Sequence, residues 1–203
     1  MHDIRLATAA DADEVGRVLA AGFCNDPVMA WMFGDDERAE KLSAFFGFLA
    51  PEALVPLGAT FLVDGSCASW APPEPGPWPD DRQERFAAAM SPFCTSRDFE
   101  RMQVLGERVD ASHPAQPYWY LGMLATVPER QGRGLGTRLL AHTLAMVDDP
   151  ERGGAQPAYL ESTNPRNVSL YERHGFRATG RIDLPDGPFM TLMWREPVDV
   201  SRG

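Results

Sequence analysis

The sequence predicts one mixed α/β domain of 203 residues, with a mixed central β-sheet flanked by helices. Three observations favour this fold class. Strand-like and helix-like hydrophobic patterns alternate along the chain, each late helical pattern follows a strand-like run, and no repeat or change of composition marks a second domain.

The N-terminal third predicts a strand and two helices. Residues 4–7 are typical of a short strand, and Thr8 and Asp11 have the spacing of a helix N-terminus. Pro27 is expected to end the first helix, and a second helix is expected from about Asp36 towards Ala50. The predicted inner face of the first helix consists of Val15, Val18, Leu19 and Phe23.

An apolar stretch at residues 42–63 carries only Glu52 as a charge. A membrane-spanning helix needs about 20 apolar residues without interruption. Because Pro51, Pro56 and Gly58 interrupt the stretch, we expect a buried helix followed by a core strand instead.

Turn signals and periodicity predict the remaining elements. Asp64-Gly65 is a hairpin turn between two strand-like runs, and the aromatic run "PYWYLGMLATV" is a central strand. The expected helix at Gly134–Val147 has the inner face Leu135, Leu139, Leu140, Leu144 and Val147. The other expected elements are a Pro-rich loop at 71–80, helices at about 82–89 and 97–109, a loop at 152–157, a strand at 158–163, a short helix at 165–174 and a closing hairpin at 176–194.

A glycine-rich turn, "QGRGLG" at residues 131–136, lies between the central strand and the next helix. The first N–H groups of a helix lack intrahelical partners, and glycines let phosphate approach the backbone. The segment lacks the lysine of a P-loop, and Thr137 stands where a dinucleotide fingerprint needs its third glycine. The turn therefore predicts a diphosphate-binding site that is neither a P-loop nor a dinucleotide fingerprint. The alternative is a glycine-rich helix start that binds nothing.

A second block, "LESTNPRNVSLYERHGF", predicts a strand followed by a short helix. Asn164 fits the N-cap with Pro165 at the first helical position, and Gly175 fits a left-handed C-cap. At about 100° per residue, Asn164, Asn167 and Tyr171 share one face. Two amides and a phenol are therefore predicted to point the same way, unless this stripe is merely solvated.

The two blocks, "LATVPERQGRGLGTRLL" and "LESTNPRNVSLYERHGF", together resemble the GNAT N-acetyltransferase superfamily. The resemblance covers most of the chain, is weakest from about residue 32 to 96, and is closest to puromycin N-acetyltransferase-like actinobacterial members. It implies the GNAT fold, with the sheet splayed between the fourth and fifth strands and acetyl-CoA in the gap. Residues 118–147 and 158–176 would then form the cofactor-binding motifs of a single N-acetyltransferase domain.

The resemblance also implies roles for individual residues. Tyr171 would be the general acid that protonates the leaving thiolate, which suits a phenol that holds its proton at neutral pH. Glu161, at the carboxyl end of the strand next to the cleft, could act as base through water, with a surface or salt-bridged carboxylate as the alternative; the resemblance also allows ordered water to serve with no single base. A backbone N–H near Leu124 would stabilise the oxyanion. The implied cofactor-binding residues are Leu124, Ala125, Thr126, Gln131, Gly132, Arg133, Gly134, Leu135, Gly136, Thr137, Asn164 and Asn167.

The acceptor is expected to be the primary amine of a small molecule, such as an aminonucleoside-type antibiotic, which would make the protein a resistance enzyme. A protein or polyamine acceptor, or a non-catalytic acyl-CoA sensor, remains an alternative. Candidate acceptor-binding residues are Asp26 and Trp31, which could meet a cation through charge and ring face, and Trp119 and Tyr120, which could form walls of the acceptor site.

Composition limits the partners. The formal net charge of −10 disfavours nucleic acid and anionic membrane surfaces and favours a cationic small molecule. Three scattered cysteines and the absence of paired histidine motifs predict reduced thiols and no metal site. The first residues lack the apolar core of a signal peptide, so we expect a cytoplasmic protein, as a monomer or homodimer.

Overall fold

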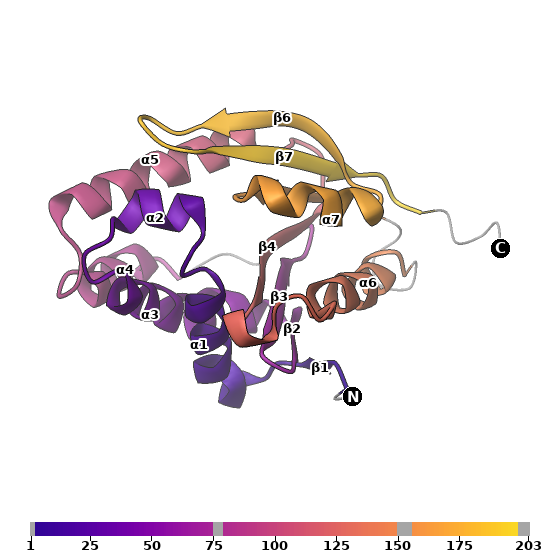
Figure 1. Cartoon of the computed structure of the whole chain (residues 1–203), viewed down its shortest axis with the longest axis horizontal. Coiled ribbons are helices and arrows are strands. Elements are labelled where there is room, and N and C mark those ends of the chain that lie inside the picture. The colour runs from indigo at the N-terminus through magenta and orange to yellow at the C-terminus, as the bar shows by residue number, and fades with distance from the viewer. Residues whose placement is uncertain (1–2, 75–78, 150–155, 199–203) are drawn as a thin grey trace.

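The computed structural model describes residues 3–74, 79–149 and 156–198. Seven strands form one mixed sheet in the order β1-β2-β3-β4-β5-β7-β6, and helices flank it (Figure 1). This confirms the predicted mixed α/β architecture. The strands are β1 Arg5–Leu6, β2 Thr60–Val63, β3 Ser66–Ala71, β4 Trp119–Thr126, β5 Ala158–Ser162, β6 Arg177–Asp183 and β7 Phe189–Arg195. The α-helices are α1 Ala12–Gly22, α2 Pro27–Phe33, α3 Arg38–Leu49, α4 Arg82–Met90, α5 Ser96–Ser112, α6 Leu135–Val147 and α7 Val168–Arg173.

Helix α2 corrects one prediction. Pro27 does not merely end the first helix, since it is the first residue of this additional helix. The Asp26 side chain caps α2 by accepting hydrogen bonds from the N–H groups of Val28 at 2.9 Å and Met29 at 3.1 Å. Proline suits the first helical position because its missing N–H would have no intrahelical partner there.

The other N-terminal predictions are confirmed. Thr8 and Asp11 form a capping box around a 3-10 turn that leads into α1. The apolar stretch at 42–63 divides into α3, a π-helical turn at Ala50–Leu54, a 3-10 turn at Val55–Leu57 and the buried strand β2. Across the described ranges, no helix is both long and apolar enough to span a bilayer.

The hairpin β2–β3 turns at Asp64 and Gly65, which both have positive φ, as a two-residue type I′ turn requires. The predicted central strand, the helix at Gly134 and the closing hairpin are present as β4, α6 and β6–β7. Residues 75–78 of the predicted Pro-rich loop and residues 152–155 of the predicted loop at 152–157 lie outside the described residues.

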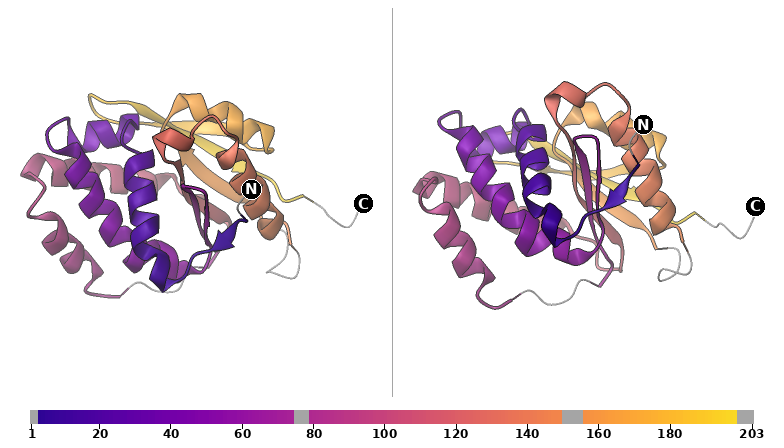
Figure 2. Two further views of the ribbon diagram at one scale, coloured as in Figure 1. Left: turned by 60° about the horizontal axis from the view of Figure 1, so that its bottom comes forward. Right: turned by 90° about the horizontal axis from the view of Figure 1, so that it is seen from below.

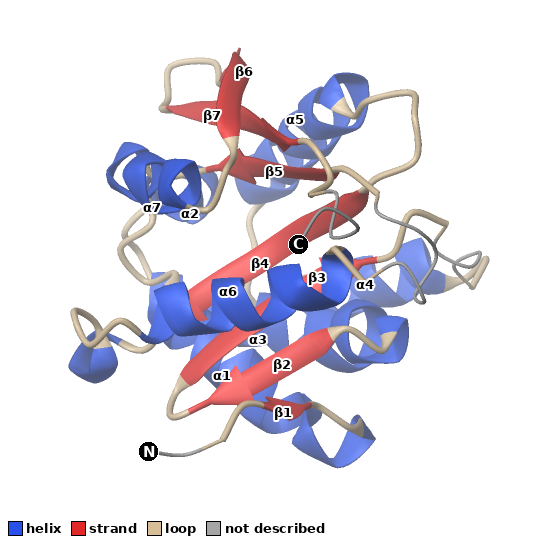
Figure 3. Ribbon diagram, turned by 90° about the vertical axis from the view of Figure 1, so that its right-hand side faces the viewer, coloured by secondary structure: helices blue, strands red, loops and turns tan. Residues whose placement is uncertain are grey.

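The sheet splits between β4 and β5. These strands are parallel and pair only at Trp119 with Ala158 and at Tyr120 with Tyr159. Figure 3 shows the two strands diverging beyond that point. On its other edge, β4 pairs with β3 as far as Thr126, so the β5 side of its second half is left without a strand partner among the described residues.

Two apolar clusters hold the helices against the sheet. Helices α1, α2 and α3 pack in one cluster with Val15, Leu19 and Phe46, and the other cluster contains Leu139 and Leu140 of α6 and Tyr171 of α7. Figures 2 and 3 show α6 on the opposite side of the sheet from α1 and α3. All five residues predicted for the inner face of α6 are buried.

Arg195, at the end of β7, ties α6 to α7. Its guanidinium makes two hydrogen bonds of 2.7 Å to the carboxylate of Asp148, directly after α6. Its Nε donates to the carbonyl of His174, directly after α7, at 3.0 Å. This buried arginine therefore fixes the spacing of the two helices that flank the split.

Candidate active site

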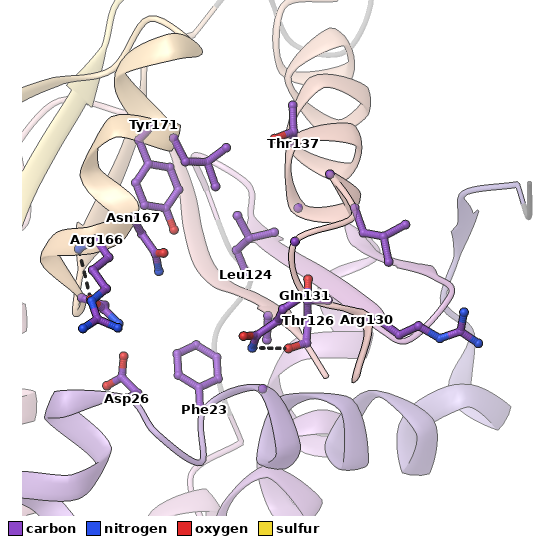
Figure 4. A pocket seen from close by; sticks show the side chains of 18 of the residues that line it. Phe23, Asp26, Leu124, Thr126, Arg130, Gln131, Thr137, Arg166, Asn167 and Tyr171 are labelled. Atoms are coloured by element: carbon purple, nitrogen blue, oxygen red, sulfur yellow. Dashed lines mark hydrogen bonds between the residues drawn. The ribbon is translucent and has the colours of Figure 1, made fainter. Parts of the chain in front are cut away.

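A cleft of about 630 Å³ opens at the split in the sheet. The second half of β4, the loop before α6, one face of α7 and the segment after α1 surround it (Figure 4). Every predicted cofactor-binding residue except Arg133 lines this cleft, and Tyr171 lines it too. The two sequence blocks thus meet in space, as their order along the chain suggested.

The loop before α6 presents unpaired backbone amides. Gly132 and Gly134 both have φ of +74°, and a Cβ built on either would meet no protein atom within 4 Å. No side chain caps α6. Among the described residues, the N–H groups from Gly132 to Thr137 have no hydrogen-bond acceptor. The loop therefore has the backbone conformation, the open space and the free donors that an anion needs.

Gln131 holds this loop against the sheet, because its side-chain amide donates to the carbonyl of Thr126 at 3.0 Å. Asn164 caps the turn before α7 by accepting from the N–H of Arg166 at 3.1 Å, as the sequence predicted. Gly175 adopts the predicted left-handed conformation, with φ of +86°. Local capping thus orients the face of α7 that carries Asn167 and Tyr171.

The Tyr171 side chain is buried and lines the cleft, and its ring packs against Phe176. Its hydroxyl points towards the space above Leu124 (Figure 4). Within the described residues this hydroxyl has no hydrogen-bond partner, so its proton is available to a bound molecule. Burial, reinforced by the negative charge of Asp26, raises the pKa of Tyr171 above its usual value.

A second, smaller cavity of about 160 Å³ adjoins the cleft. The two cavities share four lining residues: Phe23, Leu124, Asn167 and Tyr171. Apolar side chains form most of the small cavity, including Val28, Met29, Phe45, Leu105, Val109 and Met190. Among the residues that the structure describes, Glu161 is the only charged one that lines it. We call this cavity the inner pocket.

The Glu161 side chain is 2% exposed, and one carboxylate oxygen, Oε2, accepts a hydrogen bond of 2.8 Å from the hydroxyl of Tyr120. Burial raises the pKa of Glu161, and the hydrogen bond from Tyr120 and the nearby His113 partly offset that rise. A buried carboxyl whose pKa moves towards neutrality is suited to general-base catalysis.

The four candidate acceptor-binding residues occupy different places. Asp26 lines the cleft, where it also accepts from the hydroxyl of Thr163, and Tyr120 lines the inner pocket. Trp31 lines neither cavity; its indole donates to the carbonyl of Pro185 at 2.9 Å, and the guanidinium of Arg101 lies 5.0 Å from its ring centre. Trp119 is buried in the cluster beneath α6 and α7.

Sequence reasoning missed the charge of the cleft. Its charged lining residues are Arg130, Arg166, Arg173 and Asp26, an excess of positive charge in a protein of net charge −10. Arg166 and Arg173 are seven residues apart, a spacing that places them on one side of the turn and helix. That spacing could have identified them from the sequence, whereas Phe23 carried no such signal.

Among residues 3–74, 79–149 and 156–198, no group of three histidine, cysteine, aspartate or glutamate side chains could hold a metal ion. Three free cysteines, Cys24, Cys67 and Cys94, are present.

Comparisons with known proteins agree with this geometry. A family model described as an acetyltransferase (GNAT) domain matches residues 100–178. Acetyltransferase Atu2258 of Agrobacterium fabrum is 27% identical over 84 residues, which are 41% of this chain and 58% of that protein. The chain is thus matched over little more than half the length of that curated relative.

Solved structures share the fold over nearly the whole chain. A Corynebacterium glutamicum protein described as histone acetyltransferase HPA2 and related acetyltransferase is 26% identical, with a TM-score of 0.71 and 96% of both chains covered. The polyamine N-acetyltransferase of Drosophila melanogaster is 16% identical, with a TM-score of 0.61, over 95% of this chain and 97% of that one. Arylalkylamine N-acetyltransferase 2 of Aedes aegypti is 12% identical, with a TM-score of 0.62, over 96% and 98%.

The last two likenesses concern the fold alone. The described residues have the GNAT fold, and the acetyltransferase (GNAT) domain model matches residues 100–178, which are less than half of the chain.

Proposed function

We propose that the protein is an acetyl-CoA-dependent N-acetyltransferase that acts on the primary amine of a small molecule. The observation that carries this proposal is the meeting of two cavities at Tyr171. One cavity is a long cleft with free amides and arginines, and the other is a small apolar pocket with one carboxylate. A thioester at the junction would face both a proton donor and an incoming amine.

The cleft suits coenzyme A. The N–H groups of Gly132–Thr137 would hold the diphosphate at the N-terminus of α6, where the helix dipole also favours negative charge. The guanidinium groups that line the cleft would balance the remaining phosphate charge. The pantetheine arm would lie along Leu124–Thr126, where β4 has a free edge, and Asn164 and Asn167 would hydrogen-bond it.

The inner pocket supports a choice among acceptors. A polyamine would bury a second ammonium among side chains such as Phe45, Leu105 and Val109, which cannot compensate for its lost hydration. An aminonucleoside antibiotic, as puromycin N-acetyltransferase-like proteins would use, needs a pocket of about 300 Å³ or more. We therefore favour an amine with one positive charge and a compact apolar body, such as an arylalkylamine.

The residues at the junction can account for every proton that moves in the reaction. The acceptor ammonium loses one proton to Glu161, and its nitrogen then attacks the thioester carbon to form a C–N bond. A backbone N–H near Leu124 stabilises the oxyanion. As the C–S bond breaks, the Tyr171 hydroxyl donates a proton to sulfur, and the nitrogen's second proton returns to the phenolate. The net products are the amide, free coenzyme A and one released proton.

Thiol release from acetyl-CoA tests the proposal. The protein would be incubated with 2-phenylethylamine, spermidine and puromycin, with a lysine-containing peptide as the macromolecular acceptor. We expect turnover with the first amine, while spermidine or peptide turnover would support the alternative acceptors. Tight coenzyme A binding without turnover on any amine would refute the enzyme and leave the sensor.

A further inference from the structure

Two buried polar atoms on different elements face each other at the back of the inner pocket. The free carboxylate oxygen of Glu161, Oε1, lies 3.5 Å from Nε2 of His113, which follows α5. Neither atom has a hydrogen-bond partner within the described residues. An unsatisfied buried polar atom costs stability, and a proton placed between these two facing atoms would satisfy both of them.

Tyrosines enclose this pair. Tyr118, directly before β4, and Tyr120 of β4 lie beside it, and the hydroxyl of Tyr118 is hydrogen-bonded to Nδ1 of His113. Tyr159 of β5 packs against the same imidazole and shares a hydrogen bond of 3.0 Å with the Ser112 hydroxyl of α5. Burial raises the pKa of all three tyrosines, so their hydroxyls keep their protons at neutral pH.

The pair connects two different cavities. Glu161 lines the inner pocket, whereas His113 lines a separate surface cavity of about 310 Å³. Most of this surface cavity is formed by residues Ala71–Pro73 and Pro114–Tyr118. Tyr120 lines both. The carboxylate therefore contacts the acceptor side, and the imidazole, 28% exposed, contacts the surface side.

We propose that His113 is a positioning residue that carries the acceptor's proton from Glu161 to the surface cavity, so that proton release is separated from the cofactor cleft. This inference rests on the proposed function. It assigns a role to a residue outside both cofactor-binding blocks.

The relay moves one proton through two side chains. The acceptor ammonium gives a proton to Oε1 of Glu161, and that proton moves to the lone pair on Nε2 of neutral His113. The resulting imidazolium releases its Nδ1 proton to water on the side of Tyr118 and the surface cavity. The neutral ring then exchanges tautomers with solvent, and Glu161 is again a carboxylate. No bond other than O–H and N–H changes in these steps.

The pH dependence of kcat in a His113→Gln variant is the first test. We expect kcat to fall by about 100-fold, the low end of the contribution of a positioned proton-transfer group, with an altered pH profile. The KM for acetyl-CoA should be unchanged. Imidazole should restore part of the rate, because the surface cavity can admit it. His142→Gln is the matched control, since His142 is exposed on α6 and packs against Phe61.

A kcat and pH profile like those of the wild type, or a lower kcat that imidazole does not raise, would overturn the relay while leaving the acetyltransferase intact. A second measurement needs neither turnover nor a histidine variant. The 15N resonances of His113 in the folded protein should change when Glu161 is replaced by glutamine, while those of His142 stay in place. Unchanged His113 resonances would refute the contact whether or not an acceptor is known.

Discussion

Replacing Gly134 by valine tests whether the loop before α6 binds a diphosphate. Gly134 has φ of 74° and ψ of 10°, and an added Cβ would meet no protein atom within 4 Å. The fold itself thus leaves room for the new side chain. Its main cost to folding is the left-handed backbone, about 1–2 kcal/mol for a residue other than glycine.

Binding should suffer more than folding. The valine methyl groups would occupy the space beside the free N–H groups and displace a phosphate oxygen from at least one of them. A hydrogen bond to a charged group contributes about 1.5–3 kcal/mol. The Kd for acetyl-CoA should therefore rise by about 10- to 150-fold for each bond lost.

Gly58→Val is the matched control. Gly58 has φ of 70° and ψ of 15°, also has no neighbour within 4 Å of a built Cβ, and does not line the cleft. Both variants should lose about 1–2 kcal/mol, or roughly 2–8 °C in Tm for a chain of this size. Titration calorimetry with acetyl-CoA on both folded variants separates the effects. Equal affinities for Gly134→Val and Gly58→Val would show that the loop does not bind the diphosphate.

Three further predictions concern the junction and its supports. Tyr171→Phe should keep the Kd for acetyl-CoA and lower kcat by about 100-fold or more, because only the donated proton is lost; normal turnover would exclude the general-acid role. Glu161→Gln should raise the free energy of unfolding at pH 8 but hardly at pH 4. The folded-state pKa of Glu161 is raised, so its contribution to stability is fully present below the ordinary value of 4.5 and is lost as pH rises through the raised pKa. Urea titrations of both proteins at the two pH values measure this difference, and the opposite sign would contradict the reasoning. Arg195→Met should lower the free energy of unfolding by about 3–5 kcal/mol, because it leaves the half-buried Asp148 unpaired. Arg177→Met, at an exposed ion pair, should lower it by only about 0–1 kcal/mol. Equal losses of stability in thermal unfolding would contradict this account.

Local sequence signals determined much of this protein. The hairpin turn at Asp64-Gly65, the inner face of α6 and the caps at Asn164 and Gly175 were predictable because each depends on a few neighbouring residues. The prediction that Pro27 only ends the first helix was wrong, because proline can end one helix and begin the next. The Asp26 side chain, which caps α2, distinguishes these two possibilities.

Most of the cleft was likewise predictable, because two of its walls come from compact sequence blocks that each present donors on one face, whereas the wall after α1 was not predicted. The inner pocket was not, because its walls come from Phe23 after α1 and from α2, α3, α5, α7, β4, β5 and β7, whose side chains become neighbours only in the folded protein. The sequence also could not show that Trp31 and Trp119 line neither cavity, since an aromatic side chain fits a core as well as a pocket.

What the sequence determined by itself was the local chemistry: free amides before a helix, and two amides and a phenol along one helical face. What only the tertiary structure decided was which distant groups meet, such as Glu161 with His113 and Arg195 with Asp148. The physical reason is that backbone conformation follows from short-range sterics and hydrogen bonds, whereas these contacts depend on strand order and helix packing across the whole fold.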